Sequence, residues 1–239
     1  MFDHVTIRAA DRAAAERFYD TVLQTIPVEP RWTHDPYVGW RDFSLAAATE
    51  EHPATTRLHI AFAASSREVV DEFWRVGTDA GYRDDGAPGP RPQYSPDYYG
   101  AFLLDPDGNS AEAVHHGEQR TGIDHLWIGV ADVEGSKRFY EVVAPFGGYH
   151  LGSERPGFAH FDGKGGSFSV IEREPTEHVH VAFQAADNAT VDAFHRAATE
   201  AGYRDNGPPG DRTVYHEGYY GAFVLDPDGN NVEVVCHNR

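Results

Sequence analysis

Cysteine and lysine are almost absent from this sequence of 239 residues, which has one cysteine, Cys236, and two lysines, Lys137 and Lys164. A single cysteine excludes an intramolecular disulfide framework and is typical of a reducing compartment. Positive charge is scarce in general, since 20 Lys and Arg face 38 Asp and Glu and give a formal net charge of −18. This balance argues against nucleic acids and anionic membrane surfaces as partners.

Long hydrophobic runs are also missing, and none approaches the roughly 20 residues of a membrane-spanning helix. The chain opens on a strand-like pattern from Phe2 to Ile7 instead of a basic segment followed by an apolar one. No signal peptide is therefore expected, and we expect a cytoplasmic protein. With 40% hydrophobic and 24% charged residues, the composition is that of an ordinary globular chain with one or two cores.

What the chain does contain is an internal repeat at an offset of 121 residues. Residues 98–112 read YYGAFLLDPDGNSAE, and residues 219–233 read YYGAFVLDPDGNNVE. Asp-His at 3–4 recurs at 124–125, Arg-Phe-Tyr at 17–19 recurs at 138–140, and a His-containing strand recurs at 59 and 180. A duplication this regular predicts two similar domains, residues 1–118 and residues 122–239, separated by a short polar segment.

Within each half, the hydrophobic periodicity predicts a strand, a helix and further strands, twice over. In the first half, Asp11 is a suitable N-cap for the first helix, and Ser65 to Glu68 form a capping box for the second, which Gly81 is expected to end. Residues 84–97 are rich in Gly, Pro and Asp and are expected to form a loop. The Asp-Pro-Asp-Gly-Asn segment predicts a tight turn between two strands.

Two histidines and one glutamate in each half lie on the polar face of a strand whose other face is apolar. They are His4, His59 and Glu112 in the first half, and His125, His180 and Glu233 in the second. If such side chains converge, they form a site of two histidines and one carboxylate that leaves metal positions open for substrate or dioxygen. A single strand histidine is more often solvated or packed, and a duplicated gene also copies irrelevant residues, so this pattern alone leaves both interpretations open.

The Asp-His start, the Arg-Phe-Tyr helix, the histidine strand and the Leu-Asp-Pro-Asp-Gly-Asn-x-x-Glu hairpin together resemble the vicinal oxygen chelate superfamily. Its members include glyoxalase I, extradiol dioxygenases, fosfomycin-resistance enzymes and bleomycin-resistance proteins. The resemblance covers both halves and implies an α+β fold, a tandem repeat of paired βαβββ modules of the glyoxalase/bleomycin resistance/dioxygenase type. It also implies a divalent metal, with Fe(II) or Mn(II) favoured and Ni(II) or Zn(II) as alternatives, held at the six positions named above.

The resemblance leaves the pairing of these ligands open. Many homodimeric members build each site across the dimer interface, and this chain is similar to such a dimer fused into one polypeptide. In that arrangement His4 joins His180 and Glu233, and His125 joins His59 and Glu112; otherwise each half keeps its own three residues. We expect a monomer that is an intramolecular pseudo-dimer, or a homodimer.

Departures from the family patterns narrow the predicted reaction. Glyoxalase I-like sites use a fourth, acidic ligand on the fourth strand, where this chain has Ser44 and Ser169. Extradiol dioxygenases use a second histidine and a tyrosine for proton transfer, and His216 and Tyr219 are the matching catalytic candidates. The first half has Ser95 in place of His216, so only the second half carries the full set.

The loop before each hairpin supplies candidate substrate-binding residues: Arg91, Tyr94, Tyr98, Arg212 and Tyr215. The arginines would bind a substrate carboxylate and the tyrosines would line an aromatic pocket; alternatively, they pack the sheet edge and pair with nearby Asp. His115, His116 and His237 follow the last strands and are expected to be exposed.

The predicted function is that of a divalent-metal-dependent enzyme acting on a small oxygenated substrate, with an extradiol-like dioxygenase as the leading interpretation. A metal-dependent lyase or isomerase of the glyoxalase type is the first alternative. A non-catalytic protein that binds a small molecule, similar to bleomycin-resistance proteins, is the second.

Overall fold

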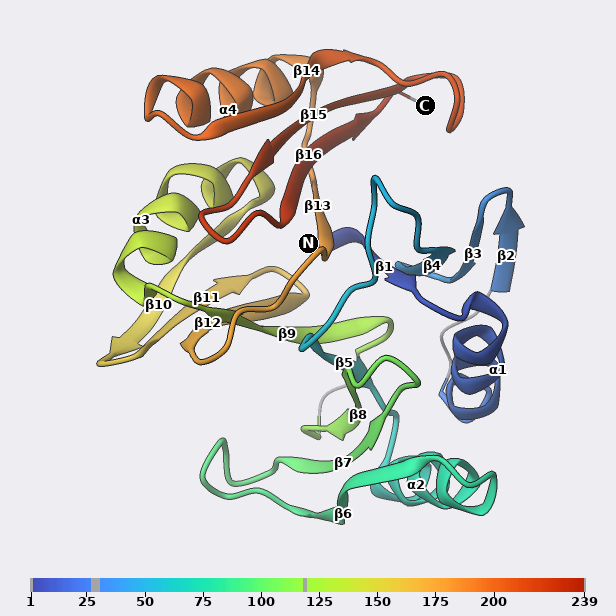
Figure 1. Ribbon diagram of the computed structural model, residues 1–239. Helices are drawn as coiled ribbons and strands as arrows, with labels where there is room; N and C mark the ends of the chain where they lie inside the picture. The colour runs from blue at the N-terminus through green and yellow to red at the C-terminus, as the bar shows by residue number, and fades with distance from the viewer. Residues whose placement is uncertain (1, 27–30, 118–119, 239) are drawn as a thin grey trace. The chain divides into compact units, whose positions relative to one another are not determined.

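The computed structural model describes residues 2–26, 31–117 and 120–238, and its elements form four successive βαβββ modules (Figure 1). The first contains β1 (Phe2–Ala9), α1 (Arg12–Leu23), β2 (Arg31–His34), β3 (Tyr37–Trp40) and β4 (Phe43–Ala47). The second contains β5 (His59–Ala63), α2 (Arg67–Asp79), β6 (Arg83–Pro90), β7 (Tyr99–Leu104) and β8 (Ser110–His115). Residues 118 and 119, at the end of the first predicted domain, lie outside the described residues.

The second half repeats this order. The third module contains β9 (Ile123–Val130), α3 (Val133–Val143), a 3-10 turn η1 (Ala144–Gly147), β10 (Tyr149–Arg155), β11 (Phe158–Gly163) and β12 (Gly166–Glu172). The fourth contains β13 (His180–Gln184), α4 (Asn188–Glu200), β14 (Arg204–Asp211), β15 (Tyr219–Leu225) and β16 (Asn231–His237). The predicted α+β fold of tandem paired modules is confirmed.

The strands form two eight-stranded sheets, and each combines modules from both halves of the sequence. One sheet has the order β14-β15-β16-β13-β1-β4-β3-β2, and the other β10-β11-β12-β9-β5-β8-β7-β6. The chain divides into two compact units, which we call the N-terminal unit, Thr6–Trp127, and the C-terminal unit, Met1–Val5 with Ile128–Arg239. Strands β1 and β9 therefore each begin in one unit and end in the other.

The helices begin and end at or next to the capping residues that the sequence indicates. The Asp11 side chain accepts a hydrogen bond from the backbone N–H of Ala14 and caps α1. Gly81, with φ of +87°, follows the last turn of α2 and supplies the left-handed conformation that ends it. The cap of α2 is Ser66, one residue beyond the predicted Ser65, because its hydroxyl accepts from Val69 N–H.

The prediction of a loop over residues 84–97 was partly wrong, because β6 covers Arg83–Pro90. This strand lies at the edge of its sheet and pairs only with β7, so its prolines remove no hydrogen bond from a second neighbour. Its register shifts between Asp84 and Gly86 and again between Gly86 and Gly89. Glycine and proline in this segment thus mark an irregular edge strand.

The Asp-Pro-Asp-Gly-Asn turn connects β7 to β8, the strand of Glu112, and its Asn109 ties it to the segment that precedes β5, the strand of His59. Asp105 accepts hydrogen bonds from the backbone of Asn109, and Gly108 has φ of +86°. The buried side chain of Asn109 accepts from Leu58 N–H at 3.0 Å and donates to the Thr55 carbonyl at 3.0 Å. The second copy of the turn repeats these contacts from Asn230 to Val179 and Thr176.

Each unit has its own aromatic core between sheet and helices, and α2 and α4 lie against the hairpins β7–β8 and β15–β16 (Figure 1). Phe18 and Val22 of α1 are buried, and so is Ile26 shortly after the helix. Tyr19 lies beside Phe18 on α1, and its hydroxyl donates to Asp105 at 3.0 Å, which ties the helix to the turn. The helix layer therefore occupies the apolar sheet face and leaves the other face for polar side chains.

The turn geometry predicts a stability effect. Asn109→Ala should lower the free energy of unfolding by about 2–4 kcal/mol, because a buried N–H and a buried carbonyl lose their partners. Urea denaturation would measure it, with Asn206→Ala, an exposed change, as a control that costs less than about 0.5 kcal/mol. An Asn109→Ala variant as stable as the unmodified protein would contradict this role of the turn.

Candidate metal centres

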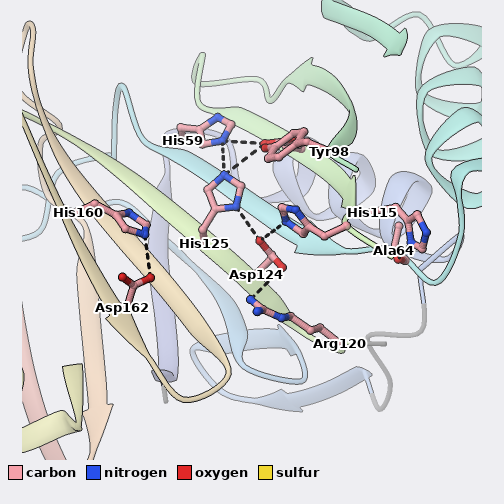
Figure 2. Close-up of polar contacts among 11 residues, drawn as sticks. His59, Ala64, Tyr98, His115, Arg120, Asp124, His125, His160 and Asp162 are labelled. Atoms are coloured by element: carbon pink, nitrogen blue, oxygen red, sulfur yellow. Dashed lines mark hydrogen bonds and ion pairs between the residues drawn. The ribbon is translucent and has the colours of Figure 1, made fainter. Parts of the chain in front are cut away.

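In the N-terminal unit, three predicted ligands converge on the polar face of the sheet, and Figure 2 shows His59 and His125 pointing toward one another. Glu112 Oε2 lies 3.0 Å from His59 Nε2 and 3.5 Å from His125 Nε2, and the two imidazole nitrogens are 3.4 Å apart. All three residues are buried. Ala61 pairs with both Glu112 and His125 across the sheet, and its small side chain leaves space between them.

The C-terminal unit contains the second triad. His180 Nε2 lies 3.0 Å from Glu233 Oε2 and 3.0 Å from His4 Nε2, while His4 and Glu233 are 3.7 Å apart. Ala182 is paired with Glu233 here, as Ala61 is with Glu112. Of the two arrangements left open by the sequence, the structure has the exchanged one, in which the first-strand histidine comes from the other half of the sequence.

The hydrogen bonds around the N-terminal triad leave it suited to hold a cation. The carboxylate of Asp124 accepts a bond from His125 Nδ1 at 2.8 Å, so the proton of a neutral His125 ring lies on Nδ1. Ser110 donates its hydroxyl proton to Asp85 and accepts from His59 Nδ1 at 3.2 Å. Both Nε2 atoms therefore face Glu112 Oε2 as acceptors, and three acceptors this close need a positive charge between them.

In the chain without metal, a proton on His125 supplies that charge. Burial alone would lower the pKa of His125, but hydrogen bonds and the charges of Asp124 and Glu112 raise it to about 9. Burial likewise opposes ionisation of Glu112, yet the hydrogen bond from protonated His125 and the close contact with His59 hold its pKa below the ordinary value. A divalent ion would replace the proton, as metal binding to histidine requires.

Each triad carboxylate is fixed by a tyrosine and approached by a glycine. The phenol of Tyr98 donates to Glu112 Oε1 at 2.7 Å, and the phenol of Tyr219 donates to Glu233 Oε1 at 2.7 Å. Burial and the neighbouring glutamate raise the pKa of both phenols far above the ordinary value, so they remain donors. A Cβ at Gly100 would collide with Glu112 Oε1, which explains a glycine directly after the tyrosine pair.

The outer partners of the first-strand histidines were not assigned from the sequence. Asp124 accepts from His125 and from His116 Nε2 at 3.0 Å, and Asp3 accepts from His4 at 2.8 Å and from His237 Nε2 at 2.7 Å. The expectation that His116 and His237 are exposed was wrong, since these contacts leave them half-buried. The repeated Asp-His pairs were the available signal.

A family model, that of the Glyoxalase/Bleomycin resistance protein/Dioxygenase superfamily, matches residues 1–113 and again residues 122–234. The chain belongs to this superfamily. The two matches reproduce the internal repeat and confirm the resemblance derived from the sequence motifs. No curated protein matches the chain significantly.

Solved structures of this superfamily share the fold over the whole chain. Glyoxalase I from Zea mays is 19% identical, with 99% of this chain and 92% of that chain covered and a TM-score of 0.72. A proposed dioxygenase from Bacillus subtilis subsp. subtilis is 13% identical, with 100% and 85% covered and a TM-score of 0.69. At these identities the likeness shows a common fold.

Of the two predicted catalytic residues, Tyr219 contacts the triad and His216 lies one residue further away. The His216 ring lies edge-on to Tyr219, with centroids 5.3 Å apart. Its Nε2 is hydrogen-bonded to His237 Nδ1 at 2.8 Å. His216 is thus connected to His4 through His237 and Asp3.

The predicted substrate-binding arginines are engaged with their own loops. Arg91 donates to the Ala87 carbonyl at 2.8 Å and lies 5.4 Å from the Phe102 ring centroid. Arg212 makes the same two contacts, with Pro208 and Phe223. These interactions hold the edge strands β6 and β14 and favour the alternative that the arginines are structural.

Of the predicted substrate-binding tyrosines, Tyr98 contacts the triad carboxylate, whereas Tyr94 and Tyr215 lie at the surface. Tyr94 packs on Tyr98 and on Trp127, with centroids 5.0 and 5.3 Å apart, and Tyr215 packs on Tyr219 at 4.9 Å. Tyr94 and Tyr215 are both exposed. Trp127, which the sequence reasoning missed, also lies 5.1 Å from the His59 ring. It stands two residues after His125, on the same face of β9.

The positions of the fourth glyoxalase I-type ligand hold hydroxyls that are used elsewhere. Ser44 is hydrogen-bonded to Thr6 at 2.7 Å, and Ser169 to His160 Nδ1 at 2.9 Å. Within residues 2–26, 31–117 and 120–238, each triad accordingly has three protein donors.

Over the same ranges no helix is long and apolar enough to cross a membrane.

The geometry predicts about two divalent ions per chain. Elemental analysis of protein purified anaerobically without an affinity tag should show one ion lost in His59→Ala, one lost in His180→Ala and both lost in the double variant. His195→Ala changes a histidine outside both triads and should retain two. Equal metal content in all four proteins would contradict the assignment.

Proposed function

We propose that this protein is a divalent-metal-dependent enzyme acting on a small substrate with two adjacent oxygen atoms. The observation that carries the proposal is the convergence of two imidazoles and one carboxylate within 3.0–3.7 Å, with no carboxylate as a fourth ligand among the described residues. A bound ion would act there as a Lewis acid or as the binding place of dioxygen.

We place the reaction at the C-terminal triad. Side chains of His4 and His180 are 24% and 19% exposed, whereas those of His59 and His125 are 6% and 8% exposed. Reactive metal sites keep a position accessible to substrate, and structural sites are closed. The enclosed N-terminal triad, beside Trp127, would then serve mainly as a structural site.

The protein residues hold this centre in position. Asp3 keeps the proton of His4 on Nδ1 and thereby directs Nε2 toward Glu233. Tyr219 occupies Oε1 of Glu233 and leaves Oε2 for the imidazoles. His180 Nδ1 is paired with the amide of Asn231, which is able to offer either its nitrogen or its oxygen.

Among metal-dependent reactions, extradiol-like dioxygenation with Fe(II) or Mn(II) fits this donor set best. The serines at positions 44 and 169 lack the carboxylate of a four-ligand site, and His216 provides a second imidazole next to Tyr219. A lyase or isomerase remains the second candidate, since the fold matches glyoxalase I from Zea mays over 99% of this chain.

We also propose that the protein acts in the cytoplasm on a small molecule and that one chain is sufficient. Each triad is completed by residues of a single chain, so a second copy is not needed to supply a ligand.

Oxygen uptake tests the dioxygenase proposal. Anaerobically reconstituted Fe(II) protein should consume oxygen with a catechol, and His180→Ala should reduce the rate by roughly 100-fold or more, since even outer partners of ligands contribute 10–100-fold. The matched change His59→Ala in the other triad should retain most activity.

The outcomes separate the three candidate functions. Isomerisation of a substrate without oxygen uptake would favour the lyase or isomerase. A ligand bound equally well by the unmodified protein, His180→Ala and Glu233→Gln, without turnover, would favour a non-catalytic binding protein.

A further inference from the structure

A chain of hydrogen bonds in the C-terminal unit leads from the triad to a histidine pair. His4 Nδ1 bonds to Asp3 Oδ1 at 2.8 Å, and Asp3 Oδ2 bonds to His237 Nε2 at 2.7 Å. His237 Nδ1 lies 2.8 Å from His216 Nε2, and His216 Nδ1 lies 2.7 Å from the Glu217 carbonyl. The His216 and His237 rings are nearly parallel, with an interplanar angle of 25° and centroids 5.0 Å apart.

The acceptors at the two ends of this hydrogen-bonded series determine how many protons the histidine pair carries. A carboxylate only accepts, so His237 Nε2 carries a proton toward Asp3. A carbonyl also only accepts, so His216 Nδ1 carries a proton toward Glu217. The contact between His237 Nδ1 and His216 Nε2 needs one more proton. Three ring protons on two imidazoles are one more than two neutral rings hold.

We propose that His216 and His237 hold one extra proton between them, as an imidazole–imidazolium pair, and that this pair is the proton store of the C-terminal triad. The carboxylate beside it supports the charge. Burial would raise the pKa of Asp3, but hydrogen bonds to His237 and His4 hold it well below its usual range. The phenol of Tyr219 also lies against both rings, and its raised pKa keeps it neutral.

The N-terminal unit has the same hydrogen bonds from the first-strand histidine to an aspartate and a second histidine, but it differs beyond that second histidine. Asp124 bonds to His125 and His116, as Asp3 does to His4 and His237. Ser95 stands where the second half has His216, and the guanidinium of Arg120 lies 3.7 Å from Asp124 Oδ2 (Figure 2). Arginine does not release its proton in proteins. The exchangeable proton is therefore a property of the C-terminal unit.

The use of this store rests on the proposed function, whereas its existence does not. A cation at His4, His180 and Glu233 would repel the positive pair, and the proton would leave from His216, the outer ring. Loss of the bridging proton would leave two unprotonated nitrogens facing each other across 2.8 Å, and loss of the Nδ1 proton would leave His216 Nδ1 facing the Glu217 carbonyl, so that one of these two hydrogen bonds would open. Metal binding would thus expel one proton from the pair in addition to any lost by the ligands.

Nitrogen-15 NMR of metal-free protein labelled in histidine tests the pair directly. At pH about 7.5 an ordinary histidine, with a pKa near 6.5, is mostly neutral. The His216 and His237 rings should together show three protonated nitrogens, and in His216→Ser the remaining His237 ring should be neutral with its proton on Nε2. His195→Ser, elsewhere in the same unit, should leave both signals unchanged. Two neutral rings in the unmodified protein would overturn the proposal.

Calorimetric titration with Zn(II) in two buffers of different ionisation enthalpy tests the coupling. His216→Ser should release about one proton fewer per chain than the unmodified protein. Equal release by both would overturn the role as a proton store. Absence of Zn(II) binding would instead defeat the proposed function, and the NMR result would still decide whether the pair holds its extra proton.

Discussion

The structure depends on one electrostatic constraint: in each unit, the facing nitrogens of two imidazoles and one carboxylate oxygen are held within 3.7 Å of one another. In the N-terminal unit these atoms are buried, so the constraint is not relieved by water. The surroundings maintain it by satisfying every other polar atom of the triad, through Asp124 and Ser110 on the rings and Tyr98 on the carboxylate. Such an arrangement is stable with a proton or a metal ion at its centre.

Strand exchange is what brings the acceptors together. The tight turn at Asp105–Asn109 aligns β8 with β5 and thereby sets Glu112 beside His59. The third residue comes from β9, which lies antiparallel to β5 and belongs to the other half of the sequence. The duplicated chain thus forms two equivalent triads, each completed by the start of the opposite half.

Much of this was accessible from the sequence because the signals are local. Asp11 and Gly81 marked the limits of their helices, and the alternation of His59 and Glu112 placed both on the polar face. Residues 84–97 were misjudged because glycine and proline do not distinguish an irregular edge strand from a loop. The contact between Asp3 and His237 joins residues 234 positions apart, and local patterns do not encode such a contact.

The two triads share their inner design and differ in what surrounds them. One is enclosed, next to Trp127 and Arg120, and the other is more exposed and is linked to His216. After duplication, one copy of a site is free to keep the fold together while the other carries out chemistry. One such difference is at matching positions 95 and 216, which hold a serine in the first half and a histidine in the second.

Anomalous diffraction from a crystal soaked in Co(II) tests the central claim most directly. The account predicts one peak in each unit, at about 2.0–2.2 Å from the Nε2 atoms of two histidines and from a glutamate oxygen. One set of ligands would be His4, His180 and Glu233, and the other His59, His125 and Glu112. A crystal with no cobalt at either triad, or with cobalt bound only by other residues, would contradict it.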